Sequence, residues 1–215
     1  MQVIIAGGTG MVGSLVLNHC LNAADISEVI SLGRKPTEKK DTKLKEVVIS
    51  NFEDYSEQEY LFKNVDVAFF CIGVYTGQVS DDLFKTITVD YAEAFAKAVE
   101  QQNPNARICL LSGDGADRTE KSKTSFARYK GMAENRIAAL NLEFYSFRPS
   151  YIYPVEPRKE PNILYKIMRG LYPLIKMLGS KYSIKSTELG SAIFNVGMNG
   201  AKQEVLENKE ILSYK

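Results

Sequence analysis

A short apolar run at the N-terminus leads directly into a turn that carries three regularly spaced glycines. The run Val3–Ala6 has the residue types of a buried strand, and Gly7, Gly10 and Gly13 follow it at GxxGxxG spacing. Such glycines let the backbone turn tightly and approach a pyrophosphate, which the N–H groups and dipole of the next helix also attract. A glycine turn can be purely structural, but its place between a strand and a helix favours a dinucleotide site. The predicted contacts are Gly7, Thr9, Gly10, Met11, Val12 and Gly13.

Short β-branched runs alternate with longer helical segments along most of the chain. This order predicts an α/β fold, a doubly wound parallel sheet of the Rossmann type with helices on both faces. The strongly apolar run Val65–Cys71 is typical of a central strand that is buried on both faces. Further strands are predicted at Val3–Ala6, Val29–Leu32, Val47–Ile49, Ile108–Leu111 and Phe144–Phe147. Crossover helices are predicted at Met11–Ala23, Asp81–Gln102 and Ser125–Leu140.

The length favours a single NAD(P)-binding domain over residues 1–215, because it suits one sizeable core and not two. The proline-rich, charged segment Pro154–Pro161 predicts an exposed loop. An amphipathic basic helix at about Ile163–Leu178 and a second helix at about Thr187–Met198 are predicted to form most of a small C-terminal lobe, residues 150–200, on the substrate side. The basic helix could instead lie on a membrane or dimerise, but such a helix more often covers a cleft.

Charge and cysteine content exclude several classes of protein. Lys and Arg total 27 against 26 Asp and Glu, so no basic field attracts nucleic acid. Cys20, Cys71 and Cys109 lack the spacing of zinc sites or disulfides, which predicts free thiols in a reducing compartment. Without a signal-like or membrane-spanning apolar run, we expect a cytoplasmic protein and no membrane contact. The only histidine, His19, is remote from the predicted cleft, so no metal site is predicted.

The second predicted strand ends in a pair of basic residues. An NAD-specific protein places an acidic residue here, about 20 residues beyond the turn, to bind the ribose 2′-hydroxyl. Arg34 and Lys35 occupy this place instead. A guanidinium pairs with a 2′-phosphate through two hydrogen bonds, so the sequence predicts NADP(H) in preference to NAD(H). The alternative is that both are solvated loop charges.

Six short motifs follow one another along nearly the whole chain. They are Gly7–Gly13, Asn51–Phe52, Cys71–Gly77, Leu111–Asp117, Lys130–Glu134 and Phe147–Ser150. Together they resemble the atypical short-chain dehydrogenase/reductase superfamily, and within it the NAD(P)-binding group that includes HIV-1 Tat-interactive protein 2. The resemblance implies that Asn51 and Phe52 border the adenine, although core packing suits Phe52 equally well. It also implies cofactor contacts from Cys71, Ile72, Gly73 and Val74, beside the adenine ribose and pyrophosphate, and from Pro149 and Ser150.

The resemblance further implies a catalytic Tyr four residues before a Lys, one helical turn apart. Lys130 is present and would hold the nicotinamide ribose, or else form a surface pair with Glu134. Position 126 is Phe, which cannot transfer a proton, and Tyr129 points elsewhere on the helix. Ser112 would hydrogen-bond a substrate carbonyl, or else be an ordinary turn residue. Related sequences carry a Ser-Ser pair at this point, and Gly113 replaces the second serine.

These features favour an NADP(H)-binding, reductase-like protein that acts on an unknown small carbonyl, quinone or flavin. Its proton would come from Tyr151, from Tyr153 or from water, unless the reaction needs no protein acid. The alternative is a non-catalytic protein that senses NADP(H) and regulates or assembles partners. A homodimer or another protein partner is compatible with either interpretation.

Overall fold

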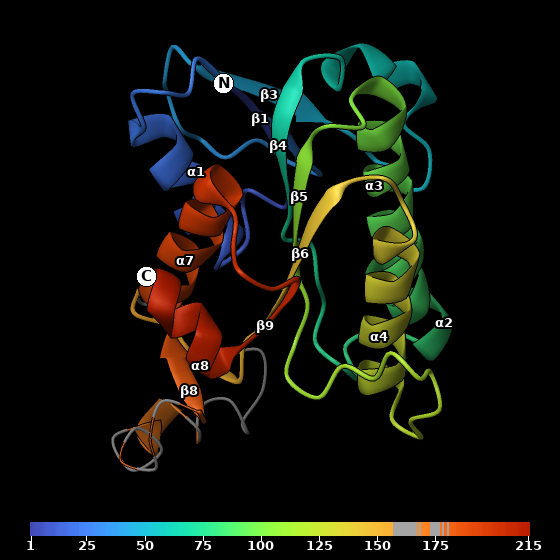
Figure 1. The fold of residues 1–215 in the computed structure, drawn as a ribbon, viewed down its shortest axis with the longest axis vertical. Coiled ribbons are helices and arrows are strands. Elements are labelled where there is room, and N and C mark those ends of the chain that lie inside the picture. The colour runs from blue at the N-terminus through green and yellow to red at the C-terminus, as the bar shows by residue number, and fades with distance from the viewer. Residues whose placement is uncertain (157–166, 168, 173–176, 178, 180) are drawn as a thin grey trace.

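The computed structural model describes residues 1–156, 167, 169–172, 177, 179 and 181–215. Its centre is a seven-stranded sheet in the order β3-β2-β1-β4-β5-β6-β9, in which every neighbouring pair is parallel (Figure 1). The strands are β1 (Gln2–Ala6), β2 (Glu28–Gly33), β3 (Leu44–Val48), β4 (Val65–Phe70), β5 (Arg107–Leu111), β6 (Glu143–Arg148) and β9 (Val205–Glu207). The doubly wound α/β fold predicted from the sequence is confirmed.

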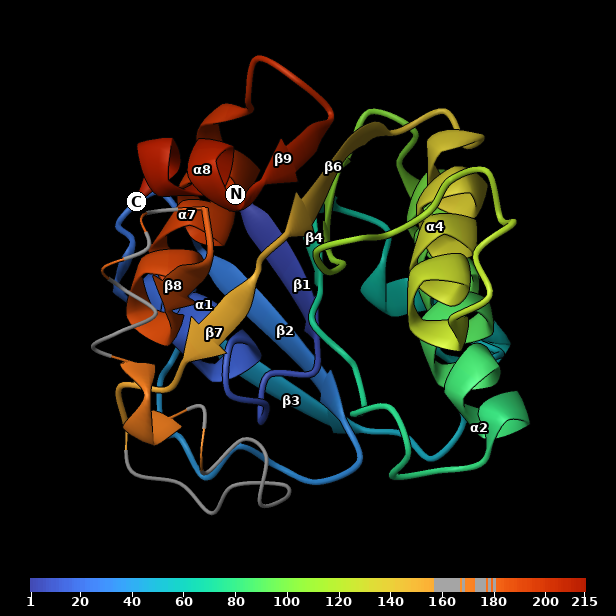
Figure 2. The ribbon, with the colours of Figure 1, turned by 90° about the horizontal axis from the view of Figure 1, so that it is seen from below.

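Helices cover both faces of the sheet (Figures 1 and 2). One face carries α1 (Gly13–Asn22), α7 (Ser186–Asn199) and α8 (Asn208–Ile211). The other carries α2 (Asp81–Lys85), α3 (Tyr91–Gln102) and α4 (Ser125–Ala138), and the five-residue π-helix η2 (Thr86–Asp90) joins α2 to α3. Two 3-10 helices, η1 (Ser56–Leu61) and η3 (Leu212–Tyr214), complete these layers.

The hydrophobic core is divided between the two faces. On β4, Phe69 and Phe70 are both almost fully buried but belong to different clusters, Phe69 with Leu17 of α1 and Phe70 with Phe95 of α3. Because successive side chains of a strand point to opposite faces, a strand covered on both sides must be apolar at nearly every position. This explains the apolar run from which a central strand was predicted.

All six predicted strands are present, but short elements near the C-terminus were not anticipated. β9 is a three-residue edge strand, and β7 (Tyr151–Tyr153) pairs with β8 (Ser183–Lys185) in a separate parallel ribbon. The predicted loop at Pro154–Pro161 and the predicted basic helix at Ile163–Leu178 lie largely outside the described residues.

The helix predicted at Thr187–Met198 is α7, and it packs on the main sheet beside α1 and not in a separate lobe. Two glycines explain this placement. A β-carbon at Gly190 would lie 2.7 Å from Cβ of Leu15, and one at Gly197 would lie 2.4 Å from the ring of Phe69. α7 therefore approaches α1 and β4 closely, which its helical periodicity alone did not reveal. In the part of the chain that the structure describes, no helix combines the length and hydropathy needed to cross a bilayer.

Candidate functional site

The strand order reverses direction beside β1. The chain moves from β1 outward to β2 and β3, then crosses back to β4 on the other side of β1. In open α/β sheets, ligands bind at the carboxyl ends of the strands where the order reverses. Figure 2 looks onto this side of the sheet, between the α1–α7 layer and the α2–α4 layer.

The glycine turn at this point requires its glycines. Gly7 has φ of 93°, and a β-carbon there would lie 2.9 Å from the carbonyl carbon of Cys71 at the end of β4. The amide of Gly10 donates to the carbonyl oxygen of Gly7 at 2.9 Å, and a β-carbon at Gly13 would lie only 2.2 Å from that same oxygen. The N-cap residue of α1 is Val12, which makes no side-chain capping hydrogen bond, and the first turn of the helix holds no acidic residue. The predicted turn is thus formed, with a helix N-terminus open to an anion.

The basic pair after β2 stands next to this turn. The amide of Gly7 donates to the carbonyl oxygen of Leu32, and a β-carbon at Gly8 would lie 2.7 Å from Oγ of Ser31. Arg34 and Lys35 follow at the same edge, and both are exposed. Within the described residues neither forms an ion pair. Both side chains thus lie exposed at the edge of the sheet where the glycine turn stands.

The residues assigned to the adenine side differ in how they are placed. Asn51 is exposed, and its Oδ1 accepts a hydrogen bond from the amide of Glu53. Phe52 is buried in the core and stacks on Tyr91 with ring centroids 5.5 Å apart. The core-packing interpretation of Phe52 is therefore confirmed, and its contact with adenine stays a prediction.

The segment after β4 runs along the same edge. Cys71 is buried against the glycine turn, and burial raises the pKa of its thiol to about 12 although Lys130 partly opposes this. Ile72 packs partly on the core, Gly73 is exposed, and Val74 contacts the apolar cluster around Phe84. A thiol with so high a pKa is inert as a nucleophile at neutral pH.

Lys130 points from α4 toward the carboxyl ends of the central strands. Its Nζ donates to the carbonyl oxygen of Leu111, the last residue of β5, at 3.0 Å. Burial lowers its pKa to about 8, while the charge of Glu134 and the proximity of Cys71 act in the opposite direction. A lysine with this pKa is still mostly charged at pH 7 and can donate to a ligand hydroxyl or phosphate.

The alternative of a surface pair between Lys130 and Glu134 is wrong. Glu134 is fully buried, and its carboxylate accepts hydrogen bonds from side chains on other elements. Arg148 holds it through Nε at 2.9 Å and Nη2 at 2.6 Å, and Nε of Arg118 adds a third contact at 2.9 Å. Ser112 and Ser146 complete the set, at 2.6 and 2.8 Å.

This cluster around Glu134 was not found from the sequence. Burial alone would raise the pKa of Glu134, but the hydrogen bonds from Arg148, Ser112, Arg118 and Ser146 outweigh burial, so its pKa is below the ordinary value. One feature of the sequence could have indicated that Glu134 is buried. It lies three residues before the apolar Ile137, so both side chains are on the same face of the helix.

Ser112, which was predicted to hydrogen-bond a substrate carbonyl, forms a hydrogen bond within the protein instead. Its hydroxyl is buried and donates its hydrogen to Glu134, so that hydrogen is not directed at a substrate carbonyl. Tyr129 donates to Asp81 Oδ2 at 2.6 Å, and its ring lies 5.9 Å from that of Phe84 on α2. Phe126 packs against Gly113, the second residue after β5.

Ser150 is tied to the protein through both its amide and its hydroxyl. The amide donates to Asn208 Oδ1, and the hydroxyl contacts Asp114 Oδ2 at 2.9 Å and the carbonyl oxygen of Lys181 at 2.8 Å. The carbonyl oxygen of the neighbouring Pro149 accepts from the amide of Asp114. These contacts fix the loop after β6 against the loop after β5, and cofactor contacts by Pro149 and Ser150 stay predictions.

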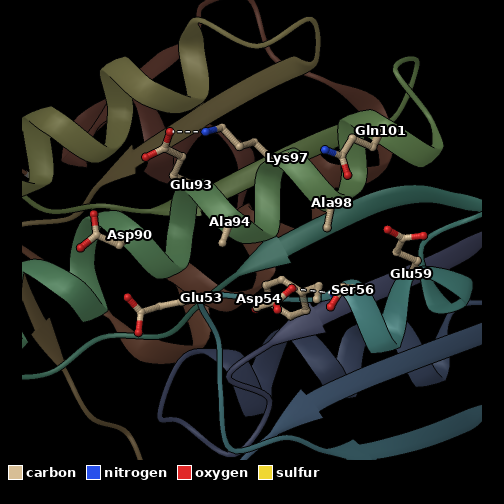
Figure 3. Close-up of a pocket in the computed structure, with 11 residues that line it drawn as sticks. Glu53, Asp54, Ser56, Glu59, Asp90, Glu93, Ala94, Lys97, Ala98 and Gln101 are labelled. Carbon is tan, nitrogen blue, oxygen red and sulfur yellow. Dashed lines mark hydrogen bonds and ion pairs between the residues drawn. The ribbon is translucent and has the colours of Figure 1, made fainter.

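A cavity of about 370 Å³ lies apart from the glycine turn, between α3 and the segment that follows β3 (Figure 3). In Figure 3, side chains of α3 face Glu53, Asp54 and Glu59 across it. Its lining also includes Asp90 and the ion pair between Glu93 and Lys97, so carboxylates dominate. Carboxylates repel phosphates, and we do not assign the dinucleotide to this cavity.

Among the described residues, no group of three or more His, Cys, Asp or Glu is placed to hold a metal ion.

Comparison with known proteins agrees with this geometry. A family model described as NAD(P)H-binding matches residues 7–170. Protein FMP52, mitochondrial, of Eremothecium gossypii is 26% identical over 144 residues, which are 66% of this chain and 62% of that protein. The match thus spans less than two thirds of that relative's length.

Solved structures share the fold at low sequence identity. Gre2 of Candida albicans in complex with NADPH has a TM-score of 0.74 at 13% identity, covering 97% of this chain and 78% of Gre2. The enzyme WbmG of Bordetella bronchiseptica in complex with NAD has a TM-score of 0.72 at 14% identity, covering 96% and 72%. With the glycine turn at the strand reversal and a family match over most of its length, the chain belongs to the NAD(P)H-binding family of Rossmann-fold proteins.

Proposed function

We propose that this chain binds NADP(H) and is a reductase-like member of the atypical short-chain dehydrogenase/reductases, in the group that includes HIV-1 Tat-interactive protein 2. The observation that carries the proposal is the glycine turn at the strand reversal, with Gly7 and Gly13 in conformations and contacts that exclude other residues. Lys130 adds a partly buried cation at the strand ends, where a nicotinamide ribose would lie.

The preference for NADP(H) rests on Arg34 and Lys35. They extend from the end of β2 beside the turn, where the adenine ribose of a bound dinucleotide would lie. No acidic residue occupies this place, and charge-assisted hydrogen bonds to a 2′-phosphate are stronger than neutral ones. Both cofactor forms occur among structural neighbours, NADPH with Gre2 and NAD with WbmG.

The proposal is tested by titrating purified protein with NADPH and with NADH while nicotinamide fluorescence is followed. We expect Arg34→Ala to weaken NADPH binding by roughly 10- to 100-fold, in line with about 1.5–3 kcal/mol for a hydrogen bond to a charged group, and to leave NADH binding unchanged. The control is Lys40→Ala, an exposed cation of the same loop. If neither nucleotide binds the unmodified protein, the proposal is wrong.

A second function, a non-catalytic NADP(H) sensor, is favoured by one observation. The place of the superfamily's proton donor holds Phe126, and the nearby Ser112 hydroxyl donates to Glu134. A sensor would bind NADPH tightly without consuming it, and its affinity for a protein partner or for a second copy would change on binding. Turnover with any acceptor would favour the enzyme. The cytoplasmic location remains a prediction for this chain.

A further inference from the structure

Two side chains of α4, one helical turn apart, hold the end of β5. Nζ of Lys130 donates to the carbonyl oxygen of Leu111 at 3.0 Å. Oε1 of Glu134 accepts the hydroxyl hydrogen of Ser112 at 2.6 Å. Residues four positions apart lie on the same face of a helix, and Leu111 and Ser112 are consecutive in the chain. The lysine and the carboxylate therefore act on the same short piece of backbone.

The peptide that joins Leu111 to Ser112 is also held by β6. Its N–H group donates to the carbonyl oxygen of Phe147 at 2.8 Å. The C=O and N–H groups of a planar trans peptide point in opposite directions, so the carbonyl of Leu111 faces away from β6. Lys130 contacts the peptide from that opposite side. The orientation of this one peptide thus determines where the lysine finds its acceptor.

Glu134 is a firm anchor for the hydroxyl of Ser112. Its buried carboxylate accepts from Nε and Nη2 of Arg148 at 2.9 and 2.6 Å, and from Nε of Arg118 at 2.9 Å. Hydrogen bonds between ionised partners are short and strong, and two of them from one guanidinium also fix the geometry. Arg148 is the last residue of β6. The carboxylate therefore joins α4 to the carboxyl ends of both β5 and β6.

Resting on the proposed function, we propose that Ser112 is a positioning residue: anchored by Glu134, it fixes the peptide carbonyl that directs the ammonium group of Lys130 toward the dinucleotide. An ammonium group has three hydrogens, and the carbonyl of Leu111 accepts one, which sets the direction of the other two. Lys130 touches the cofactor, and Ser112 acts through it. This role differs from the contact with a substrate carbonyl that the resemblance implies, because the hydroxyl hydrogen is donated to Glu134.

The test titrates the whole protein with NADPH at pH 7 while nicotinamide fluorescence is followed. We expect Ser112→Ala to raise the dissociation constant about 3- to 10-fold, as for weakening of a hydrogen bond to a charged group. The matched control is Ser146→Ala, because the buried hydroxyl of Ser146 donates to the same Oε1 of Glu134, at 2.8 Å. It lies within β6 and not beside the acceptor of Lys130, so a change below about twofold is expected.

Folding is checked separately for each variant by urea denaturation. Ser112→Cys keeps nearly the same shape but is only a weak hydrogen-bond donor, and the same direction of change is expected for it. The test therefore does not depend on the stability of Ser112→Ala. Ser112→Thr keeps the hydroxyl group and is expected to bind NADPH within about twofold of the unmodified protein.

A double-mutant cycle distinguishes an action through Lys130 from a direct contact. In a Lys130→Met background, Ser112→Ala is expected to change the dissociation constant by less than about twofold, since the group that it positions is gone. A hydroxyl that touched the nucleotide itself would keep its full effect in this background.

Equal effects of Ser112→Ala and Ser146→Ala would overturn the inference. An effect of Ser112→Ala that persists without the lysine, or Ser112→Thr binding as weakly as Ser112→Ala, would overturn it too. In each of these cases the unmodified protein still binds NADPH and the proposed function stands. If the unmodified protein binds neither NADPH nor NADH, the proposed function fails and this inference falls with it.

Discussion

The ring of Phe126 occupies the space in which a side chain of residue 113 would stand, so Gly113 and Phe126 are sterically coupled. We expect Gly113→Ala to destabilise the protein by about 1–3 kcal/mol, the usual cost of overpacking, because the ring must swing away from the loop. Denaturation by urea at pH 7 measures this change.

The coupling is isolated by combining Gly113→Ala with Phe126→Ala, which removes the ring. The double variant is expected to be more stable than the sum of the single effects predicts, by at least about 1 kcal/mol, as found for residues in contact. Effects that add within about 0.5 kcal/mol would show that the ring has room to move and that the two residues are independent.

At the glycine turn, Gly13 meets backbone and not a mobile side chain. A β-carbon there would lie 2.2 Å from the carbonyl oxygen of Gly7, which also accepts from the amide of Gly10. We therefore expect Gly13→Ala to cost about 3 kcal/mol or more and to abolish dinucleotide binding, because the turn must open. Gly73→Ala is the matched control for stability, since no atom lies within 4 Å of its β-carbon, and its effect should stay within about 0.5 kcal/mol. Equal melting temperatures of the two variants would contradict the geometry.

Glu134 should be among the most sensitive positions for stability. Glu134→Gln removes the charge that balances Arg148 and Arg118 inside the protein, which typically costs about 3–5 kcal/mol. The control is Glu143→Gln on the half-exposed pair with Arg107, for which at most about 1 kcal/mol is expected. Urea denaturation of both variants at pH 7 gives the comparison.

The same carboxylate predicts how stability responds to acid. Because the pKa of Glu134 is lower in the folded than in the unfolded protein, its contribution is complete above the unfolded value, about 4.3, and is lost as pH falls through the folded value. The unmodified protein should therefore lose stability more steeply than Glu134→Gln below about pH 4. Parallel curves would show that Glu134 is not ionised in the folded state.

The sequence predicted the sheet well because its signals are local. The six longer strands are runs rich in β-branched or aromatic residues, most of them separated by helices, and the handedness of βαβ units leaves few ways to order them. β9 was missed because three residues carry little pattern, and its strand form depends on pairing with β6, far away in sequence. α7 was recognised as a helix, but its place on the sheet depends on Gly190 and Gly197, whose contacts are long-range.

The residues of the candidate site likewise fall into those that local sequence reveals and those that depend on tertiary contacts. The glycine turn and the basic pair Arg34–Lys35 are recognisable because each follows directly on a strand. The spacing of Lys130 and Glu134 suggested a surface pair, whereas Glu134 binds Ser112, 22 positions earlier in the chain, and Arg148, 14 positions later. Such partners are set by tertiary structure, so spacing on one helix could not reveal them.

Lys130 provides a pH-dependent test of the site. Its pKa of about 8 means that the ammonium form falls from about 90% at pH 7 to about 10% at pH 9. If the charged form holds the dinucleotide, the apparent dissociation constant for NADPH rises in inverse proportion to that fraction, by about tenfold over this range. Lys130→Arg should remove the dependence, because a guanidinium stays charged throughout.

Lys130 also affects the stability of the protein. Measuring stability as a function of pH separates the effect of its charge on folding from its role in binding. The pKa of Lys130 is lower in the folded protein than the unfolded value of about 10.4, so the unfolded chain binds more protons between about pH 8 and pH 10. The contribution of Lys130 to stability therefore increases as pH rises through this window and is absent in Lys130→Met. An increase in stability that disappears in Lys130→Met, together with NADPH affinity that does not change with pH, would show that the lysine is buried as proposed but does not touch the nucleotide.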